Sequence, residues 1–239
     1  MTTRPVAEPD RAAALAQYRG RAGVYDLELA LFEPIREEAI SRLALRRGDT
    51  VLDVGCGTGL SFDRLQRDIG PTGCIVGIEQ CPEMLQRVQR KVEKRGWLNV
   101  TLLCAPVEMA AIALKADAAL FHFTHDILRR PEAVANVMAH LKPGAHVAAA
   151  GLQWAGPWNW AVNNFVLAAA LHSTTSLEGL DKPWDGLEDS LDGLEVHTRG
   201  MGGIYILSGA RSGKSSRPAP APALAPARKR ARRSRTLAQ

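Results

Sequence analysis

Three glycines at alternate positions follow a short apolar run and define the first candidate site. Thr50 to Gly59 reads TVLDVGCGTG, and its glycines are Gly55, Gly57 and Gly59. Glycine adopts positive φ and lets another molecule approach the backbone closely, so this loop can lie directly against a ligand. Residues 60–68 favour a helix whose first amides would point at the same ligand and favour a carboxylate there. The pattern predicts a strand, a tight turn and a helix around a ligand.

An acidic side chain at the end of the next apolar run indicates which ligand. Glu79 ends a predicted strand over 74–79, roughly 20 residues after the last glycine, where a carboxylate can accept both hydroxyls of a ribose. The dinucleotide fingerprint is G-x-G-x-x-G, whereas this loop reads G-x-G-x-G and is preceded by Asp53. The spacing indicates a nucleoside site that is not built for a pyrophosphate.

Both motifs resemble those of class I S-adenosylmethionine methyltransferases. VLDVGCGTG is similar to the first motif of that family, and Ile78 to Leu85, IEQCPEML, is similar to its second. The resemblance is greatest to the methyltransferases of ubiquinone and menaquinone biosynthesis, over roughly residues 18–208. It implies S-adenosyl-L-methionine as cofactor and S-adenosyl-L-homocysteine as product. The cofactor-binding residues it implies are Asp53, Gly55, Cys56, Gly57, Thr58, Gly59, Glu79, Gln80, Val107, Glu108 and Phe121.

The loop after the third expected strand departs from this family's pattern. The resemblance implies an Asp there that recognises the adenine amino group, but Pro106 occupies the position. Glu108 or a backbone carbonyl would have to make the contact instead. A non-catalytic nucleoside-binding module of the same fold therefore stays open as an alternative.

Strands and helices are expected to alternate along the body of the chain. Apolar runs predict strands near 51–54, 74–79, 99–104, 116–123 and 146–151, followed by an antiparallel pair at 194–197 and 203–207. Apolar periodicity predicts helices over 26–45 with a bend near Pro34, over 60–68, from Pro82 to about 96, and from Pro131 through Leu141. Together these elements predict an α/β fold: a Rossmann-like, seven-stranded, mostly parallel sheet with an antiparallel last strand and helices on both faces.

Composition divides the chain into one domain and two tails. Residues 1–16 are expected to be a flexible N-terminus, 17–209 the methyltransferase domain, and 210–239 a disordered, Pro/Ala-rich basic tail. Residues 211–239 hold nine Lys or Arg and no acid, so the net charge of +5 leaves residues 1–210 at −4, the difference between +5 and +9. Such a tail attracts polyanions, either nucleic acid or an anionic membrane surface, although an incidental extension is equally compatible.

Aromatic residues and asparagines gather in an expected insertion at about 152–180. The resemblance implies that additions at this point shape the acceptor pocket and that the segment around Tyr18 and Tyr25 closes over it. The alternatives are a helix that covers the core without a ligand, and two tyrosines that only pack the first helix. The residues predicted to bind the acceptor are Tyr18, Tyr25, His122, His125, Trp154, Trp158 and Asn163.

His125 is the candidate general base. It follows the strand at 116–123, at the edge of the sheet where ligands bind in open α/β folds, and histidine titrates near neutral pH. A base is needed only if the acceptor is a hydroxyl or a protonated amine. Asp126 is adjacent, but neighbours on an extended chain point to opposite sides, so a dyad is not assumed. A structural role for His125 and His122 remains the alternative.

The cysteines and the apolar segments bear on metals and location. The four cysteines show no C-x-x-C spacing, so no metal site is expected and the thiols are interpreted as reduced. No apolar run reaches the length of a membrane span, which favours a cytoplasmic protein.

The sequence predicts a methyltransferase for a small, partly apolar metabolite with a C, O or N acceptor. The alternative is an acceptor that is nucleic acid, protein or a lipid headgroup reached through the basic tail. The oligomeric state stays open.

Overall fold

The fold is built on one seven-stranded sheet. The computed structural model describes residues 30–213, so Tyr18, Tyr25, the expected N-terminal segment and most of the basic tail lie outside the described residues. The strand order is β3-β2-β1-β4-β5-β7-β6. The strands are β1 (Thr50–Val54), β2 (Cys74–Glu79), β3 (Val100–Cys104), β4 (Ala116–His122), β5 (Leu141–Leu152), β6 (Leu191–Arg199) and β7 (Ile204–Arg211).

The direction of the strands confirms the expected fold class. The pairs β1·β2, β1·β4, β2·β3 and β4·β5 are parallel, whereas β7 runs antiparallel to both β5 and β6. The first five strands end at the same edge of the sheet, called the carboxyl edge below. The glycine loop, defined as Gly55–Gly59, follows β1 at this edge and β7 begins there.

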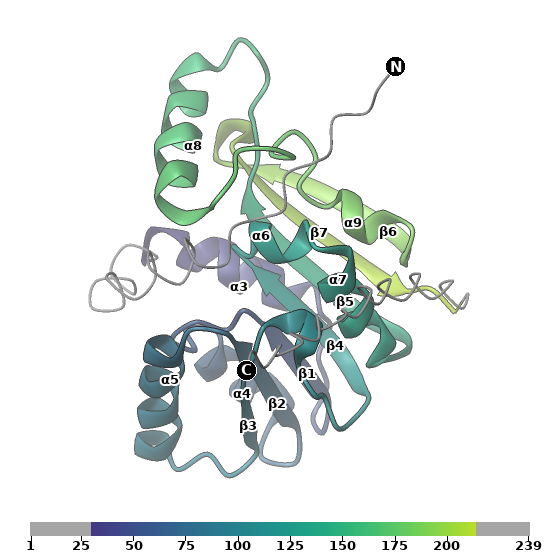
Figure 1. The fold of residues 1–239 in the computed structure, drawn as a ribbon. Helices are drawn as coiled ribbons and strands as arrows, with labels where there is room; N and C mark the ends of the chain where they lie inside the picture. Colours follow the sequence, from purple (N-terminus) through teal and green to yellow (C-terminus); the bar gives the residue numbers. More distant parts are fainter. Residues whose placement is uncertain (1–29, 214–239) are drawn as a thin grey trace, which may run out of the picture.

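Helices cover both faces of the sheet (Figure 1). One face packs against α3 (Glu33–Ser41), α4 (Phe62–Ile69) and α5 (Pro82–Arg95). The other packs against η2 (Val107–Met109), α6 (His125–Leu128), α7 (Pro131–Ala139) and α9 (Asp185–Glu188). Successive side chains of a strand point to opposite faces, so Val51 joins the first core and Leu52 the second. Unbroken apolar strands are therefore buried on both sides.

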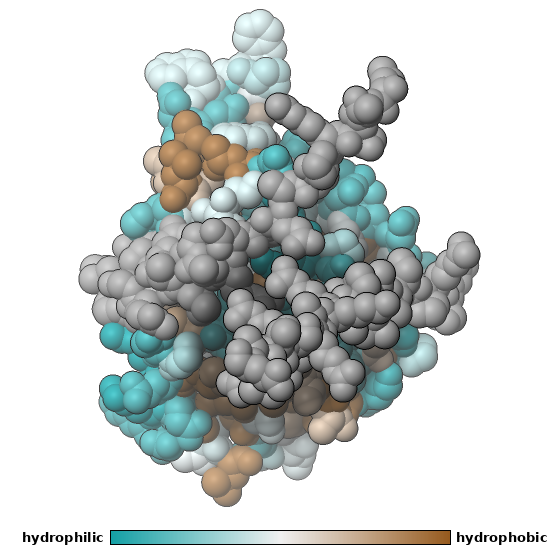
Figure 2. Space-filling view, viewed as in Figure 1, coloured by the Kyte–Doolittle hydropathy of each residue, from teal (hydrophilic) through white to brown (hydrophobic). Residues whose placement is uncertain are grey.

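A third apolar cluster lies at the carboxyl edge, around the expected insertion. The segment forms α8 (Trp160–Ser173), which stands apart at one end of the molecule (Figure 1). Only Val166 and Ala170 of this helix are buried, and apolar side chains gather on its outer surface (Figure 2). The buried members of the cluster are Leu152, Val166, Ala170, Leu180 and Ile204. The insertion is thus a helix held by a narrow apolar contact.

Several element boundaries differ from those expected. The helix near residue 34 begins at Glu33 and follows a short 3₁₀ turn, η1 (Ala30–Phe32), so Pro34 starts the helix and does not bend it. Proline fits a first turn because the missing N–H has no partner there in any helix. Leu141 begins β5 by pairing with Ala116 and does not extend α7.

The folded domain also extends past the expected boundary at residue 209. β7 continues to Arg211, which pairs with Leu191, and the Ser212 amide donates to the Ser190 carbonyl at 2.9 Å. Ser212 is buried. Across the part of the chain that is described, no helix is both long and apolar enough to span a membrane.

Candidate functional site

The glycine loop is shaped by contacts that exclude side chains. Gly55 and Gly59 have φ values of +72° and +73°, which L-residues with side chains rarely adopt. A Cβ on Gly55 would lie 2.7 Å from a methyl of Thr124, and one on Gly59 would lie 2.4 Å from a methyl of Val88. The loop therefore sits tightly between α5 and the start of α6, with its backbone available to a ligand at the carboxyl edge.

Glu79 is fixed at the end of β2 by backbone amides. One carboxylate oxygen accepts a hydrogen bond from the Gly57 amide at 3.1 Å, and the other accepts from the Cys81 amide at 2.7 Å. Burial raises the pKa of Glu79, and these amide hydrogen bonds oppose that shift. Each oxygen keeps a lone pair, so the carboxylate can still accept from a diol beside the glycine loop.

Two buried charged side chains near the loop lack a full set of partners. Asp53 and Arg36 are each 2% exposed. Within residues 30–213, Oδ2 of Asp53 and Nη2 of Arg36 have no hydrogen-bond partner. Burial raises the pKa of Asp53 to about 7, although the nearby Arg36 charge and a hydrogen bond from Ser61 favour the carboxylate. Unsatisfied buried charges are costly, so these atoms are suited to a charged ligand.

Sequence reasoning missed Arg36 and Ser61. Arg36 also pairs with Glu33, which lies one turn earlier on α3. A signal was present in the sequence: Arg36 is four residues before Ile40 and seven before Leu43, so it lies on the apolar stripe of the predicted helix. A charge on that stripe is expected to be buried and to need a partner.

His125 begins α6 and is 7% exposed. Its Nε2 lies 2.9 Å from the Glu178 carbonyl oxygen, and among the described residues its Nδ1 has no partner. Because a carbonyl only accepts, Nε2 must carry the proton and Nδ1 the lone pair. Burial lowers the pKa of His125, which favours the neutral ring. His125 lines a small cavity with Phe123, Gly151, Leu152, Ser173, Thr174 and Tyr205.

Comparison with known proteins identifies this arrangement. Residues 51–144 match the family described as a methyltransferase domain, and this segment contains the glycine loop, Glu79 and His125. The match supports a class I S-adenosylmethionine-dependent methyltransferase domain. The cofactor of such a domain is S-adenosylmethionine. The unpartnered carboxylate and guanidinium atoms at the loop, together with Glu79, fit the charged and hydroxyl groups of that molecule.

Individual relatives match parts of the methyltransferase domain. The probable cobalt-precorrin-6B C(15)-methyltransferase (decarboxylating) of Saccharolobus solfataricus is 36% identical over 88 residues, which are 36% of this chain and 44% of that protein. Aklanonic acid methyltransferase of Streptomyces sp. strain C5 is 28% identical over 88 residues, which are 36% of this chain and 40% of that protein. The chain thus spans less than half the length of these relatives.

A solved structure extends the likeness in fold. The N-methyltransferase NodS from Bradyrhizobium japonicum WM9, in complex with S-adenosyl-L-homocysteine, has a TM-score of 0.60 and 13% sequence identity. The match covers 83% of this chain and 98% of that chain. At this identity the comparison supports the class I fold over nearly the whole described domain.

The methyltransferase domain brings most expected cofactor residues to one edge. Asp53, the glycine loop with Cys56 and Thr58, Glu79 and Gln80 all lie at the carboxyl ends of β1 and β2. Phe121 is the exception, because its side chain is fully buried in the core on the α7 face. On β4 it alternates with Leu120, which faces the opposite core, so the Phe121 side chain serves packing.

The expected acceptor residues are distributed unevenly. Trp154 is half-buried against the third cluster, whereas Trp158 is 93% exposed on the turn before α8 and, within the described residues, is not a pocket wall. Asn163 accepts from the Ala155 amide at 2.8 Å, which orders the turn before α8. His122 lies close enough to Arg36 to be affected by its charge. Its Nε2 has no partner among residues 30–213, and burial with the Arg36 charge holds its pKa well below the usual range.

Both expected substitutes for the missing adenine contact already have partners. The Glu108 carboxylate lies 3.6 Å from the Arg130 guanidinium, and the Val107 carbonyl accepts from Asn136 at 2.7 Å. Val107 is buried and Glu108 half-buried in η2, beside the end of β3. An adenine amino group would have to share one of these acceptors. The role of Val107 and Glu108 therefore stays a prediction.

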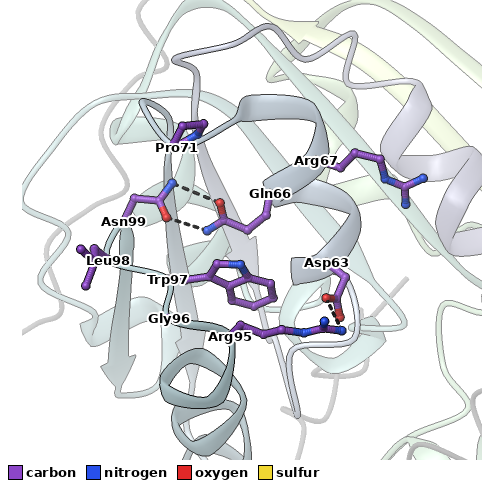
Figure 3. Close-up of a pocket in the computed structure, with 9 residues that line it drawn as sticks. All are labelled: Asp63, Gln66, Arg67, Pro71, Arg95, Gly96, Trp97, Leu98 and Asn99. Atoms are coloured by element: carbon purple, nitrogen blue, oxygen red, sulfur yellow. Dashed lines mark hydrogen bonds and ion pairs between the residues drawn. The ribbon is translucent and has the colours of Figure 1, made fainter.

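A wider surface hollow of about 630 Å³ lies away from this edge, between the end of α4 and the start of β3 (Figure 3). Four of its polar side chains bind one another in pairs: Gln66 and Asn99 exchange amide hydrogen bonds of 2.8 and 3.2 Å, and Arg95 pairs with Asp63 at 2.8 Å. Asn99 also donates to the Gly73 carbonyl at 2.8 Å. These contacts join α4 to β3, so the hollow has a structural explanation. Among the described residues no cluster of three or more His, Cys, Asp or Glu is arranged for a metal ion.

Proposed function

We propose that this protein transfers the methyl group of S-adenosylmethionine to a small, partly apolar acceptor. The observation that carries the proposal is the pair of buried, incompletely partnered charges, Asp53 and Arg36, beside the glycine loop. An amino-acid group presents one ammonium and one carboxylate. Asp53 would accept from the ammonium, and Arg36 would donate to the carboxylate. Glu79 would bind the ribose hydroxyls at the end of the neighbouring strand.

The chemistry expected of the chain is mainly one of positioning. When bound, the cofactor supplies an electrophilic methyl carbon on a sulfonium. The glycine loop and Glu79 hold one reactant at the carboxyl edge, while Phe123, Leu152 and Trp154 supply an apolar environment next to it. Fixing two reactants in line and excluding water lowers the barrier substantially, with effective molarities that reach about 10⁵ M or more in favourable cases.

Several observations support a small acceptor. The small cavity beside His125 is mainly apolar, which is compatible with a partly apolar acceptor at this edge. By their names, two relatives act on a cobalt-precorrin and on aklanonic acid, which are small molecules. Tyr18 and Tyr25, expected to close over the acceptor, lie outside the described residues and stay part of the proposal. So does a cytoplasmic location.

A polyanionic acceptor or surface is the second candidate, and the charge of the C-terminal segment favours it. The nine basic residues after 210 include Arg211, which lies in β7, so the remaining eight follow residue 213. Lys and Arg in such a segment would attract phosphate groups of nucleic acid or anionic lipid. A chain that ends at residue 213 keeps the whole described domain and removes this charge, so comparing the two forms separates the candidates.

Calorimetric titration of S-adenosylmethionine and S-adenosylhomocysteine tests the proposal. We expect micromolar-range binding, about −8 kcal/mol at 1 µM, to the full chain and to the chain ending at residue 213. Asp53→Asn and Arg36→Gln should weaken binding by at least about tenfold, the effect of losing one charged hydrogen bond of about 1.5–3 kcal/mol. Circular dichroism would confirm that each variant is folded.

Asp117→Asn is the matched control. Asp117 lies at the opposite end of β4, where it accepts from the Thr50 amide at 3.0 Å and pairs with Lys142 at 2.6 Å. The same chemical change there should leave cofactor affinity unaltered. Absence of binding to folded wild-type protein would overturn the proposed function, and equal affinities of the three variants would move the cofactor away from Asp53 and Arg36.

A further inference from the structure

The short helix α6 uses its polar side chains to hold one distant segment, residues 174–179, called the clamp segment here. His125 lies 2.9 Å from the Glu178 carbonyl through Nε2. Asp126 accepts from the amide and hydroxyl of Thr175 at 3.1 and 2.9 Å. Arg129, which ends the helix, donates to the Ser176 hydroxyl at 3.0 Å and to the Glu178 carboxylate at 2.9 Å. Three side chains of one helical turn thus fix a loop about fifty residues away.

These contacts determine which nitrogen of His125 is basic. A proton on Nε2 is required by the Glu178 carbonyl, so the lone pair is on Nδ1, which has no partner among residues 30–213. If Glu178 moved away, neither tautomer would be favoured by this contact. The position of a backbone carbonyl on the clamp segment therefore controls the chemistry of the imidazole.

Arg129 is the side chain best placed to hold that carbonyl. Its side chain is only 11% exposed, and its two terminal nitrogens bind two different residues of the clamp segment, Ser176 and Glu178. A guanidinium can make both contacts at once because its donors diverge in one plane, whereas a lysine offers a single charged nitrogen. The Glu178 side chain is 57% exposed, so the ion pair alone adds little, but the guanidinium is mostly buried and makes a second hydrogen bond to Ser176.

This inference rests on the proposed methyl transfer. We propose that Arg129 is a positioning residue that keeps Nδ1 as the basic atom of His125. The acceptor for such a base bears an O–H or N–H group. The acceptor's heavy atom forms a bond to the methyl carbon as the carbon–sulfur bond breaks, and that electron pair goes to sulfur. The acceptor proton passes to Nδ1, which gives an imidazolium that still donates through Nε2 to Glu178. Release of this proton to water restores the ring.

Several charged or titratable groups face His125 from the surrounding elements. They are Asp126 and Arg129 on α6, Glu178 on the clamp segment and Tyr205 on β7. The Asp126 charge raises the pKa of His125, whereas the Arg129 charge lowers it. Burial raises the pKa of the Tyr205 hydroxyl, so that group stays neutral. Loss of the Asp126 charge should therefore lower the pKa of His125, and loss of the Arg129 charge should by itself raise it.

Nitrogen-15 NMR of the histidine side chains in the full chain tests this proposal directly. The His125 signals are assigned by their loss in His125→Gln. We expect the wild type to show a neutral ring protonated at Nε2 at pH 7. Arg129→Ala should give a mixture of tautomers, because it removes the clamp. Loss of the positive charge raises the His125 pKa, whereas loss of the hydrogen bond to the Glu178 carbonyl lowers it. Arg129→Lys should restore the Nε2–H form only in part.

Two further variants separate the hydrogen bonds from the charge. Asp126→Asn keeps an oxygen that accepts from Thr175 and removes the negative charge, so it should lower the His125 pKa without changing the tautomer. Arg130→Ala removes the same charge from the next residue, which pairs with Glu108, and should leave the tautomer unaltered. Arg130 is the matched control for the loss of one arginine.

The outcomes are decisive without a known acceptor. A wild-type ring protonated at Nδ1, or an Arg129→Ala ring with the wild-type tautomer, would overturn the proposal. If Arg129→Ala does not fold, Arg129→Lys carries the same test. Neither cofactor nor acceptor is needed for this measurement, so it can fail while calorimetry still shows cofactor binding, and the reverse can also occur. The two proposals are therefore tested separately.

Discussion

The glycine loop and helix α6 with its clamp segment lie at the same edge of the sheet, but different kinds of contact hold them. Around the loop, the Glu79 carboxylate accepts from the backbone amides of Gly57 and Cys81. Around α6, side chains such as Asp126 and Arg129 bind residues about fifty positions away. One half of the site is thus built from backbone groups close in sequence, and the other half from side chains joined across the fold.

This difference predicts how each half can be damaged. The first half, around the glycine loop, is proposed to bind the cofactor and is called the cofactor half. Because backbone groups are present in every residue, this half depends on backbone shape and on the absence of side chains at Gly55 and Gly59. The second half, around α6 and the clamp segment, is proposed to lie beside the acceptor and is called the acceptor half. It depends on the identity of single side chains, since other side chains cannot make the two contacts of the Arg129 guanidinium at once. Steric substitutions should therefore affect the first half most, and conservative changes of functional group should affect the second.

The largest effect is expected from Gly59→Ala. The new Cβ would lie 2.4 Å from a Val88 methyl, at a φ of +73° that alanine rarely adopts. Strain and overpacking together should lower the free energy of unfolding by about 2–4 kcal/mol and weaken cofactor binding. Urea denaturation followed by circular dichroism measures the first effect, and calorimetry measures the second.

Gly96→Ala is the control for this substitution. Gly96 ends α5 with a similar φ of +66°, but nothing lies within 4 Å of its added Cβ. It should cost only the backbone term, about 1 kcal/mol, and leave cofactor affinity unchanged. Combining Gly59→Ala with Val88→Ala should recover part of the free energy of unfolding that Gly59→Ala alone loses. Equal destabilisation by the two glycine variants would contradict the tight packing of the loop.

A smaller effect is expected from pH, and it concerns Asp53. Burial raises the pKa of Asp53 to about 7, opposed by the Arg36 charge and the Ser61 hydrogen bond. A carboxyl with a raised folded pKa makes the folded state lose stability as pH rises from about 4 to about 7, because the unfolded chain ionises first. An ammonium beside Asp53 favours the carboxylate, so cofactor binding near pH 6 should release a proton.

Calorimetry at several pH values measures this coupling. Affinity for S-adenosylmethionine should rise by up to about tenfold per pH unit below pH 7, and level off above it. Titrations in two buffers with different ionisation enthalpies count the released proton. Asp53→Asn should bind more weakly and lose the dependence. An affinity that is constant between pH 5.5 and 7.5 would show that Asp53 is already ionised in the free protein or does not meet a cation.

The same contrast explains what could be predicted from the sequence. The mostly parallel sheet, the glycine loop and the position of Glu79 were predictable, because the apolar runs alternate regularly and the loop and Glu79 follow them at short spacing. His125 was placed at the correct edge. Its partner was not predictable, because that partner is a backbone carbonyl 53 residues away and carbonyls leave no mark on the sequence. Arg36 was missed although its place on an apolar helical stripe was visible.

The smallest effect should come from Trp158, one of the residues predicted to bind the acceptor. Its side chain is 93% exposed, so Trp158→Ala should change the free energy of unfolding by no more than about 0.5 kcal/mol. Trp154 is half-buried against the third cluster, and its alanine variant should cost about 1–3 kcal/mol, less than a fully buried tryptophan. Urea denaturation of the two variants provides the comparison.

The outcome for Trp158 bears on how far the acceptor half extends. If both tryptophan variants behave as expected, the third cluster ends at Trp154 and the acceptor pocket is confined to the cavity beside His125. A loss above about 1 kcal/mol for Trp158→Ala would exceed what an exposed side chain can contribute. Trp158 would then have to be covered by something beyond residues 30–213, and the acceptor half would be larger than the contacts of α6 and α8 define.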